Sequence, residues 1–394
     1  MASFFSRLAR RAAPSRASAT APAQKASRAA ALFGMNLPGL SRFQPRNAPE
    51  LIRCGYERNP VVYRSVRLIS EAVASVPWLV AVDGEDAPDH PLHALLARPN
   101  AGQAGAAFME TIASHLLLSG NAYVEAVTLD GALREFHALR PDRMSIVPGA
   151  GGWPAAFDYR AGADKLRFVT RDGESPILHL KIFAPLDDHY GFAPLAAAET
   201  ALDIHNAASA WNRALLDNAA RPSGALVYAG PDGAALSDEQ FERLKSELDE
   251  NFTGARNAGR PLLLEGGLDW KALSLSPKDM DFIDAKAAAA RDIALALGVP
   301  PMVLGLPGDN TYSNYQEANR AFWRQTVTPF VRHIQAAFEA WLQPHLGAFT
   351  IAANLDGVDA LAVDRAAEWA RIGAADFLTQ DEKREALGYG PRKD

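Results

Sequence analysis

The stretch GVPPMVLGLPGDNTYSN, residues 298–314, decides the fold, because it divides two segments that both show helical periodicity. It contains three prolines and three glycines, a composition that excludes a regular helix or strand and predicts an irregular loop. On its N-terminal side, Ser276 at the N-cap and Pro277 at the first helical position predict the start of a long helix that ends at the first glycine of the loop. The loop is therefore expected to begin where this helix ends.

Further long helices are expected on both sides of the loop. A helix over about residues 314–342 follows it, and Pro329 within that helix removes the hydrogen bond to the carbonyl of Gln325 and favours a kink. Farther upstream, apolar residues at three-and-four spacing predict an amphipathic helix over residues 193–219. Residues 223–275 carry strand and capping-box signals, which indicates a small α/β insert between two long helices. Near the C-terminus, Thr379 and Glu382 predict a capping box at the start of a short helix.

The N-terminal part of the chain mixes helix and strand signals. Strands are predicted over residues 78–82 and 122–127, and a helix over residues 108–118 is stopped by Gly120. Short β runs separated by turn signals follow. An apolar stripe also predicts a helix that begins after Asn59, with members at spacings of four and three, namely Val62, Val66, Ile69, Val73 and Val76. The fold class is therefore expected to be α+β.

Charge is distributed unevenly along the 394 residues. The whole chain carries 40 basic and 46 acidic side chains, a net charge of −6. The first 49 residues hold eight of the basic residues and no acidic one, so the remaining body has a net charge of −14. An Ala-, Ser- and Arg-rich arm without acids fits a mitochondrial transit peptide, and it fits equally a disordered basic tail that contacts nucleic acid or a partner.

Several classes of chemistry are absent from the sequence. The single cysteine, Cys54, excludes an intrachain disulfide and fits a reducing compartment. There is no phosphate-binding loop, no H-E-x-x-H and no G-x-S-x-G motif. His90 and His93 are the closest histidine pair and lack further metal donors nearby, so capping or surface roles are expected. No charge-free run exceeds sixteen residues, and we expect no membrane span, cofactor, metal or catalytic residue.

Eight stretches between about residues 59 and 315 carry a family resemblance. In order along the chain they are NPVVYRSVRLISEAVASVPW, HPLHALLARPN, LLLSGNAYVE, GFAPL, NAGRPLLLEGG, LSLSPKDMDF, ALGVPPMVLG and NTYSN. They resemble portal proteins of tailed double-stranded-DNA bacteriophages with long non-contractile tails, and the C-terminal LTQDEKREALGYGP is similar in a less specific way. The short, alanine-rich chain also resembles portals of gene transfer agents, the phage-like particles of alphaproteobacteria.

The resemblance implies a ring subunit with named regions around an axial channel. Portal rings typically contain twelve subunits, and the channel is narrowed by a tunnel loop. A short helical crown is implied here. The implied regions are a basic flexible N-terminal arm (1–45), a wing (46–192), stem helix 1 (193–222), a clip (223–275), stem helix 2 (276–299), a tunnel loop region (300–314), a kinked wing helix (315–346), and a crown with the C-terminal tail (347–394).

The implied function is a structural DNA conduit without enzymatic activity. The ring would lie at the capsid vertex of a virion or phage-like particle assembled in the bacterial cytoplasm. The terminase large subunit would package double-stranded DNA through it, and the major capsid protein and a head-tail adaptor would be further partners. An acidic body suits this function, because a strongly basic channel would bind phosphates and hold them.

The resemblance also implies candidate site residues in three regions. In the stem, the residues are candidates for the channel lumen or for contacts between subunits. In the clip, they are candidates for contact with the motor and adaptor. The residues are Leu306, Asp309, Asn310, Thr311 and Tyr312 in the tunnel loop; Lys278, Asp281 and Lys286 in the stem; and Glu242, Lys245, Asp249 and Arg256 in the clip.

Two other functions remain open at the level of the sequence. The arm is compatible with a mitochondrial matrix enzyme that loses an N-terminal transit peptide on import. It is also compatible with a nucleic-acid-binding module whose arm supplies the affinity.

Overall fold

The computed structural model describes residues 48–149, 152–171, 174–217, 224–228, 268–272, 282–308 and 311–387, together with the separate residues 237, 239, 240, 242, 243 and 246. Helices and antiparallel strands both contribute to these ranges, as the predicted α+β class requires. Among the helices described, none combines the length and the apolar character needed to cross a bilayer.

The centre of the body is a pair of packed helices, α3 and α5. The predicted stripe on α3 is buried, and Val62, Val66 and Ile69 have no exposed surface. Asn59 caps this helix, because its side-chain oxygen accepts the backbone N–H groups of Val61 and Val62. The helices of this part are α2 (Ala48–Cys54), α3 (Pro60–Ala74), α4 (Pro91–Ala97) and α5 (Gly105–Ser119).

Three small antiparallel sheets complete the body, in the orders β4-β3-β8, β5-β6-β7 and β11-β1-β2. The third sheet joins distant parts of the chain, since Trp78 of β1 lies opposite Ala353 of β11. The sequence did not predict β11. The bounds are β1 (Trp78–Val82), β2 (Glu85–Asp86), β3 (Asn121–Leu129), β4 (Ala132–Leu139), η1 (Pro141–Arg143), β5 (Met144–Pro148), β6 (Pro154–Ala161), β7 (Asp164–Val169), β8 (Ile177–Lys181) and β11 (Thr350–Ala353).

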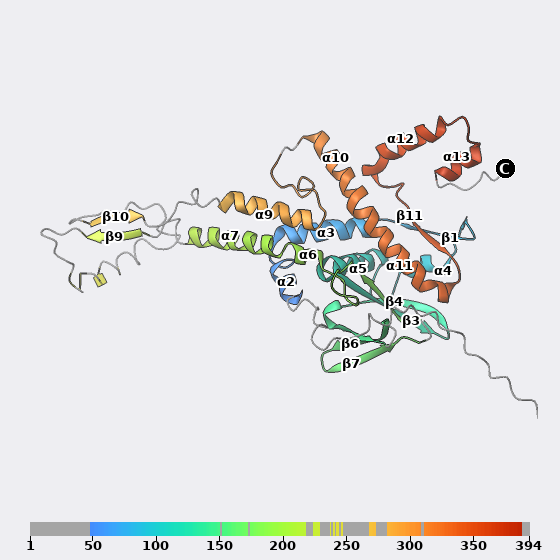
Figure 1. The fold of residues 1–394 in the computed structure, drawn as a ribbon, viewed down its shortest axis with the longest axis horizontal. Helices are drawn as coiled ribbons and strands as arrows, with labels where there is room; N and C mark the ends of the chain where they lie inside the picture. The colour runs from blue at the N-terminus through green and yellow to red at the C-terminus, as the bar shows by residue number, and fades with distance from the viewer. Residues whose placement is uncertain are drawn as a thin grey trace, which may run out of the picture.

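Two helices, α7 and α9, lie side by side and project from the body, with the paired strands β9 and β10 near their far end (Figure 1). The single helix predicted over residues 193–219 is in fact two helices. Ala198, at φ −99° and ψ 11°, leaves the helical conformation between them. The bounds are α6 (Pro194–Ala197), α7 (Glu199–Asp217), β9 (Gly224–Tyr228), β10 (Leu268–Ala272) and α9 (Phe282–Ala296).

The long helix after the loop begins at Tyr312, two residues before its predicted start, and continues to Leu346. A π-helical segment interrupts this helix and ends directly before α11, and the kink predicted at Pro329 stays a prediction. Pro329 itself lies in the first turn of α11, where a proline is tolerated best. The three parts are α10 (Tyr312–Phe322), the π segment η4 (Trp323–Val327) and α11 (Thr328–Leu346).

The C-terminal part returns to the body before it forms its own helices. After β11, Thr379 and Glu382 form the predicted capping box of the last helix, and each side chain bonds the other residue's backbone N–H, at 3.2 Å and 2.7 Å. The helices are η5 (Asp359–Leu361), α12 (Ala362–Gly373) and α13 (Gln380–Ala386).

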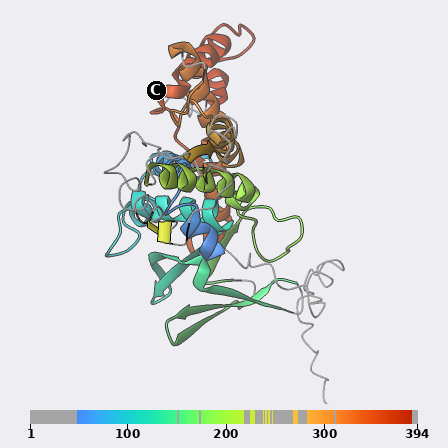
Figure 2. The same ribbon diagram turned by 90° about the vertical axis from the view of Figure 1, so that its left-hand side faces the viewer.

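The outline is elongated, with the paired helices α7 and α9 at one side of a broad body (Figure 1). In the turned view, α12 and α13 lie at one end of the body and the strands β6 and β7 at the other (Figure 2). The irregular loop of residues 298–314 lies between α9 and α10. It is therefore next to both the projecting helices and the long broken helix.

Candidate functional site

The first part of the irregular loop is a series of turns held against the body. The backbone N–H groups of Val303 and Leu306 donate to the carbonyl oxygens of Pro300 and Pro301, each at 3.0 Å. The side chain of Leu306 is half-buried and packs against the main hydrophobic core. This part of the loop therefore has a defined conformation despite its three prolines.

Two side chains from neighbouring helices hold the ends of this segment. Thr326, in the π segment, donates its hydroxyl to the carbonyl oxygen of Gly298 at 2.5 Å. Arg291, on α9, donates to the carbonyl oxygen of Pro307. The loop is thus tied both to a projecting helix and to the break in the long helix. The sequence analysis did not single out Arg291 or Thr326, because no motif or periodicity marks a side chain that binds a distant carbonyl.

The remaining predicted loop residues have different positions. Thr311 is the N-cap of α10, and its hydroxyl accepts the backbone N–H of Asn314 at 3.2 Å. Tyr312 begins the helix and is 79% exposed. Asp309 and Asn310 lie outside the described residues. Leu306, Thr311 and Tyr312 therefore flank the two undescribed positions.

In the stem, the predicted residue Lys286 lies on α9 and is half-buried. Burial lowers the pKa of His205 on α7, and the positive charge of Lys286 lowers it further. Lys286 is therefore near the partner helix of its own chain. The other two predicted stem residues, Lys278 and Asp281, fall in a part of the chain that the structure does not describe.

Two alanines of the run at residues 287–290, together with Ala294, lie on a buried face of α9. Ala289 and Ala290 are 3% and 4% exposed, and Ala294 has no exposed surface. These residues share one face of α9 with the fully buried Ile293. Small side chains at such a face let helices pack closely.

In the clip, the predicted residue Glu242 is helical and exposed. The predicted capping box before it is present: the Ser237 N–H donates to Gln240 Oε1 at 3.0 Å, and the Gln240 N–H donates to Ser237 Oγ at 3.3 Å. The other three clip candidates, Lys245, Asp249 and Arg256, are outside the described ranges.

A buried polar cluster joins the stem to the body. Asn59 Nδ2 lies 2.9 Å from Nδ1 of His205 and donates to Oδ1 of Asn206, also at 2.9 Å. Asn206 in turn donates to the carbonyl oxygen of Cys54 at 3.0 Å. Asn59 and His205 are 1% and 5% exposed, so α7 is fixed at the point where α2 ends and α3 begins.

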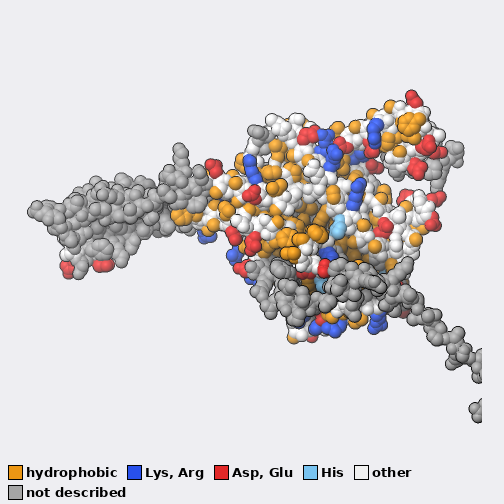
Figure 3. Space-filling view, in the orientation of Figure 1, with side chains coloured by type: hydrophobic (Ala, Val, Ile, Leu, Met, Phe, Trp, Pro, Cys, Tyr) orange, Lys and Arg blue, Asp and Glu red, His pale blue; other side chains and the backbone are white. Residues whose placement is uncertain are grey.

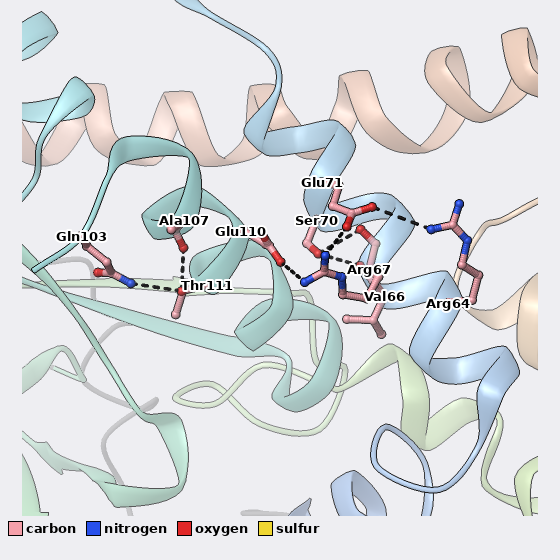
Figure 4. A network of polar contacts seen from close by, with 9 residues as sticks. All are labelled: Arg64, Val66, Arg67, Ser70, Glu71, Gln103, Ala107, Glu110 and Thr111. Atoms are coloured by element: carbon pink, nitrogen blue, oxygen red, sulfur yellow. Dashed lines mark hydrogen bonds and ion pairs between the residues drawn. The ribbon is translucent and has the colours of Figure 1, made fainter.

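A network of charged side chains links the two central helices on the surface. Figure 4 shows Arg67 of α3 between Glu71 of the same helix and Glu110 of α5, with the Arg67–Glu110 bond at 2.7 Å. Arg64 lies 3.8 Å from the other carboxylate oxygen of Glu71. All four side chains are partly exposed, so solvent screens these ion pairs and each adds little to the stability of the fold.

Nothing in the described part of the chain resembles a metal centre, because no cluster of three or more His, Cys, Asp or Glu side chains is present there. His90 has the predicted capping role: its Nδ1 accepts the backbone N–H of Leu92 at 3.3 Å, at the start of α4. The main features of the described site are the polar junction between α7 and the body, the buried alanine face of α9, and the loop held by Arg291 and Thr326.

The sequence profile of the family described as "Phage portal protein" matches residues 60–388. The chain belongs to the phage portal protein family. Among solved portal-family relatives, a chain in the "Neck of empty GTA particle computed with C6 symmetry" is 53% identical, with a TM-score of 0.75 over 93% of this chain and all of that chain. One in the "Neck of native GTA particle computed with C12 symmetry" is 54% identical, with a TM-score of 0.69 over 88% of this chain and 95% of that one.

The resemblance drawn from the sequence motifs is confirmed by these portal matches. A protein of Rickettsia bellii (strain RML369-C) is also 44% identical over 343 residues, which are 86% of this chain and 89% of that protein. Portal proteins are structural components of particles, and membership of such a family supports the expectation that the chain is not an enzyme. The alternative of a mitochondrial matrix enzyme has no support in these matches.

Proposed function

We propose that this portal subunit forms a ring of twelve at the head-tail vertex of a gene-transfer-agent-like particle, with a channel through which double-stranded DNA is packaged and later released. The observation that carries the proposal is the likeness, above 50% identity, to chains in necks computed with C6 and C12 symmetry. That likeness extends over most of the chain. A ring follows when one face of a subunit fits a different face of its neighbour and the rotation closes.

The projecting helices supply faces suited to such contacts. Ile283 and Leu295 on α9 are 74% and 77% exposed, and Ile204 on α7 is 44% exposed. Ile283 and Ala287 are about one turn apart on the same side of α9, and Leu295 lies about 120° farther around the helix axis, so α9 exposes apolar side chains over a broad face. Figure 3 shows apolar side chains over much of the body as well. Burial of this surface against neighbours in a ring would be favourable.

The charge of the body suits the passage of DNA. Residues 50–394 carry 32 basic and 46 acidic side chains, and twelve bodies would carry a net charge of about −168. Phosphates are repelled by acidic surfaces and bind basic ones through release of counterions. An acidic ring therefore lets the duplex slide.

The loop from about Gly305 to Asn314 is the proposed tunnel loop that narrows the channel. Arg291 ties its N-terminal part to α9 at Pro307, and Thr326 ties Gly298, at the start of the segment that leads into the loop, to the π segment. A movement of the loop would therefore be transmitted to the stem and to the broken helix. Leu306, Asp309, Asn310, Thr311 and Tyr312 are the residues proposed to lie nearest the DNA.

The proposed contacts with other proteins lie at the far end of the stem. The clip, residues 223–275, would bind the terminase large subunit during packaging and the head-tail adaptor afterwards. Glu242, Lys245, Asp249 and Arg256 are the proposed contact residues. The wing would face the major capsid protein.

Assembly and activity of the purified full-length chain test the proposal directly. Light scattering after size-exclusion chromatography should give a species near 509 kDa, twelve times the 42.4 kDa chain, and electron-microscope images along its axis should show a ring with a central hole. The protein alone should not hydrolyse ATP. A species that stays monomeric at high protein concentration and in the presence of adaptor would contradict the proposal.

A further inference from the structure

A cavity of about 420 Å³ lies between α2, the end of α5 and η1, and the proposed DNA channel makes no use of it. Protein cavities that bind ligands have volumes of about 300–1,000 Å³. The wall contains three tyrosines, Tyr56, Tyr123 and Tyr190, and two prolines, Pro49 and Pro141. It is therefore rigid and largely apolar, with a few polar atoms among the rings.

One polar atom of the wall lacks a partner. Nδ1 of His115 is buried and makes no hydrogen bond with any described group. Burial lowers the pKa of His115 to about 4, so the imidazole is neutral at pH 7. A buried polar atom without a hydrogen-bond partner destabilises the folded state. An occupant with a hydrogen-bonding group would remove this cost.

The described part of the chain begins beside this cavity, at the start of α2. Pro49, Ile52 and Tyr56, all on or next to α2, line it, and 47 residues precede the described range. The last twelve of them, residues 36–47, read NLPGLSRFQPRN and contain three large apolar residues, two prolines and two arginines. Proline favours an extended conformation with exposed backbone groups, which aromatic-lined grooves bind well.

The charges at the cavity also fit this segment. Asp142 is already engaged by Arg140, which donates two hydrogen bonds at 2.9 Å and 2.7 Å. Glu57 is exposed and has no ion pair with any described residue, and it is available to the two arginines of the segment. Among the lining residues, Arg53 is the cation nearest to Glu57 in the sequence.

The comparison with particle necks supplies an independent observation. Residues 48–394 make up 88% of this chain, whereas the match to the C6 neck structure covers 93% of it. The match therefore extends into the first 47 residues.

We propose that residues 36–47 dock into the tyrosine-lined cavity of their own chain, with Leu37, Leu40 and Phe43 against the rings and a backbone group paired with His115. Twelve extended residues reach about 40 Å, several times the roughly 10 Å length of α2. The covalent link also gives the segment a high effective concentration at its own cavity. Only the more distal, basic part of the arm would then extend away from the body.

Cysteine crosslinking in the full-length protein tests this docking. In a Cys54→Ser background, Leu40→Cys is combined either with Ile52→Cys, which lines the cavity, or with Glu50→Cys, an exposed residue of the same helix outside it. Oxidation should link the Leu40–Ile52 pair within one chain at least tenfold faster. Glu50 is nearer to Leu40 along the sequence, so equal rates would overturn the proposal. A link between two chains would overturn it too, since the segment would then occupy a neighbour's cavity.

Limited trypsin digestion provides a second measurement without introduced cysteines. Cleavage after Arg42 and Arg46 should be at least tenfold slower than cleavage after Arg28, which lies outside the docked segment. The variant Leu40→Asp/Phe43→Asp alters only the arm, and it should raise cleavage after Arg42 and Arg46 to the rate at Arg28. Cleavage at all three sites at the same rate in the wild-type protein would overturn the proposal.

Discussion

At the scale of single residues, the glycines of two sequence motifs, Gly120 and Gly191, are explained by one close contact between their backbones. Gly120 ends α5 with φ 72°, and a Cβ on Gly191 would lie 2.0 Å from the carbonyl oxygen of Gly120. Between them, Asn121 accepts the N–H of Gly191 at 2.7 Å and donates to its carbonyl at 3.2 Å. The stretches LLLSGNAYVE and GFAPL therefore meet in space, which the sequence alone did not show.

A methyl group at this contact should be strongly destabilising. Gly191→Ala should lower the free energy of unfolding by about 3 kcal/mol or more, because the backbone must move to admit the Cβ. Gly102→Ala is the matched control, since the nearest atom to its added Cβ would be 3.6 Å away. Urea unfolding followed by circular dichroism measures both, and the control should change by less than about 0.5 kcal/mol. Equal midpoints for the two variants would contradict this account of the motif.

The same junction makes stability depend on pH. His179 Nε2 lies 3.0 Å from Asn121 Oδ1, which can only accept, so the neutral ring carries its proton on Nε2. Burial lowers the pKa of His179 to about 3. The unfolded chain, with an ordinary histidine pKa near 6.5, binds this proton first, so stability falls as the pH drops below about 6.5.

Replacement of the titrating ring should remove that dependence. Between pH 6.5 and 5 the wild type should lose on the order of 1–2 kcal/mol more than His179→Gln, in which an amide N–H can replace the donor. Unfolding midpoints in urea at the two pH values give the comparison. His137→Gln, at an exposed histidine that bonds Glu135, is the control and should behave as the wild type does. A parallel loss in His179→Gln would show that another group is responsible.

At the scale of helices and strands, the sequence predicted what depends on local periodicity and missed what depends on distant partners. The stripe on α3, the strand β1 and the capping box at Thr379 follow from spacing and side-chain chemistry, and all are present. The break at Ala198 has no glycine or proline to mark it. β11 is four residues long and pairs with β1 from the other end of the chain, so no local pattern could identify its partner.

The tie between α9 and the loop belongs to this scale as well. Arg291→Gln should free the carbonyl of Pro307, and hydrogen exchange of the backbone amides of residues 303–306 should become about tenfold faster. Arg371→Gln, at an exposed arginine of α12 that pairs with Glu368, is the control. Both variants should still form rings. Unchanged exchange in Arg291→Gln would mean that the turns within the loop are sufficient to hold it.

At the scale of the whole molecule, the side of α9 that carries the exposed Ile283 is proposed to contact a neighbouring subunit in the ring. Ile283→Asp places a charge on that side of α9 and should shift the purified protein from rings toward monomers, with at least tenfold less ring at equal concentration. Leu129→Asp introduces the same charge at a residue of β3 that is 61% exposed, and should leave the ring intact. Analytical ultracentrifugation measures both. Rings of normal yield in Ile283→Asp would place this side of α9 away from the subunit contacts.

The pairing of β1 with β11 also orders events during synthesis. The two strands are about 275 positions apart, a separation that makes their closure late and slow compared with the local contacts of the helices. While the chain is still on the ribosome, β1 has only the two-residue strand β2 beside it. A truncated chain thus keeps an open sheet edge. The sheet is therefore completed only once β11 has been made, and until then the free edge of β1 is open to other strands.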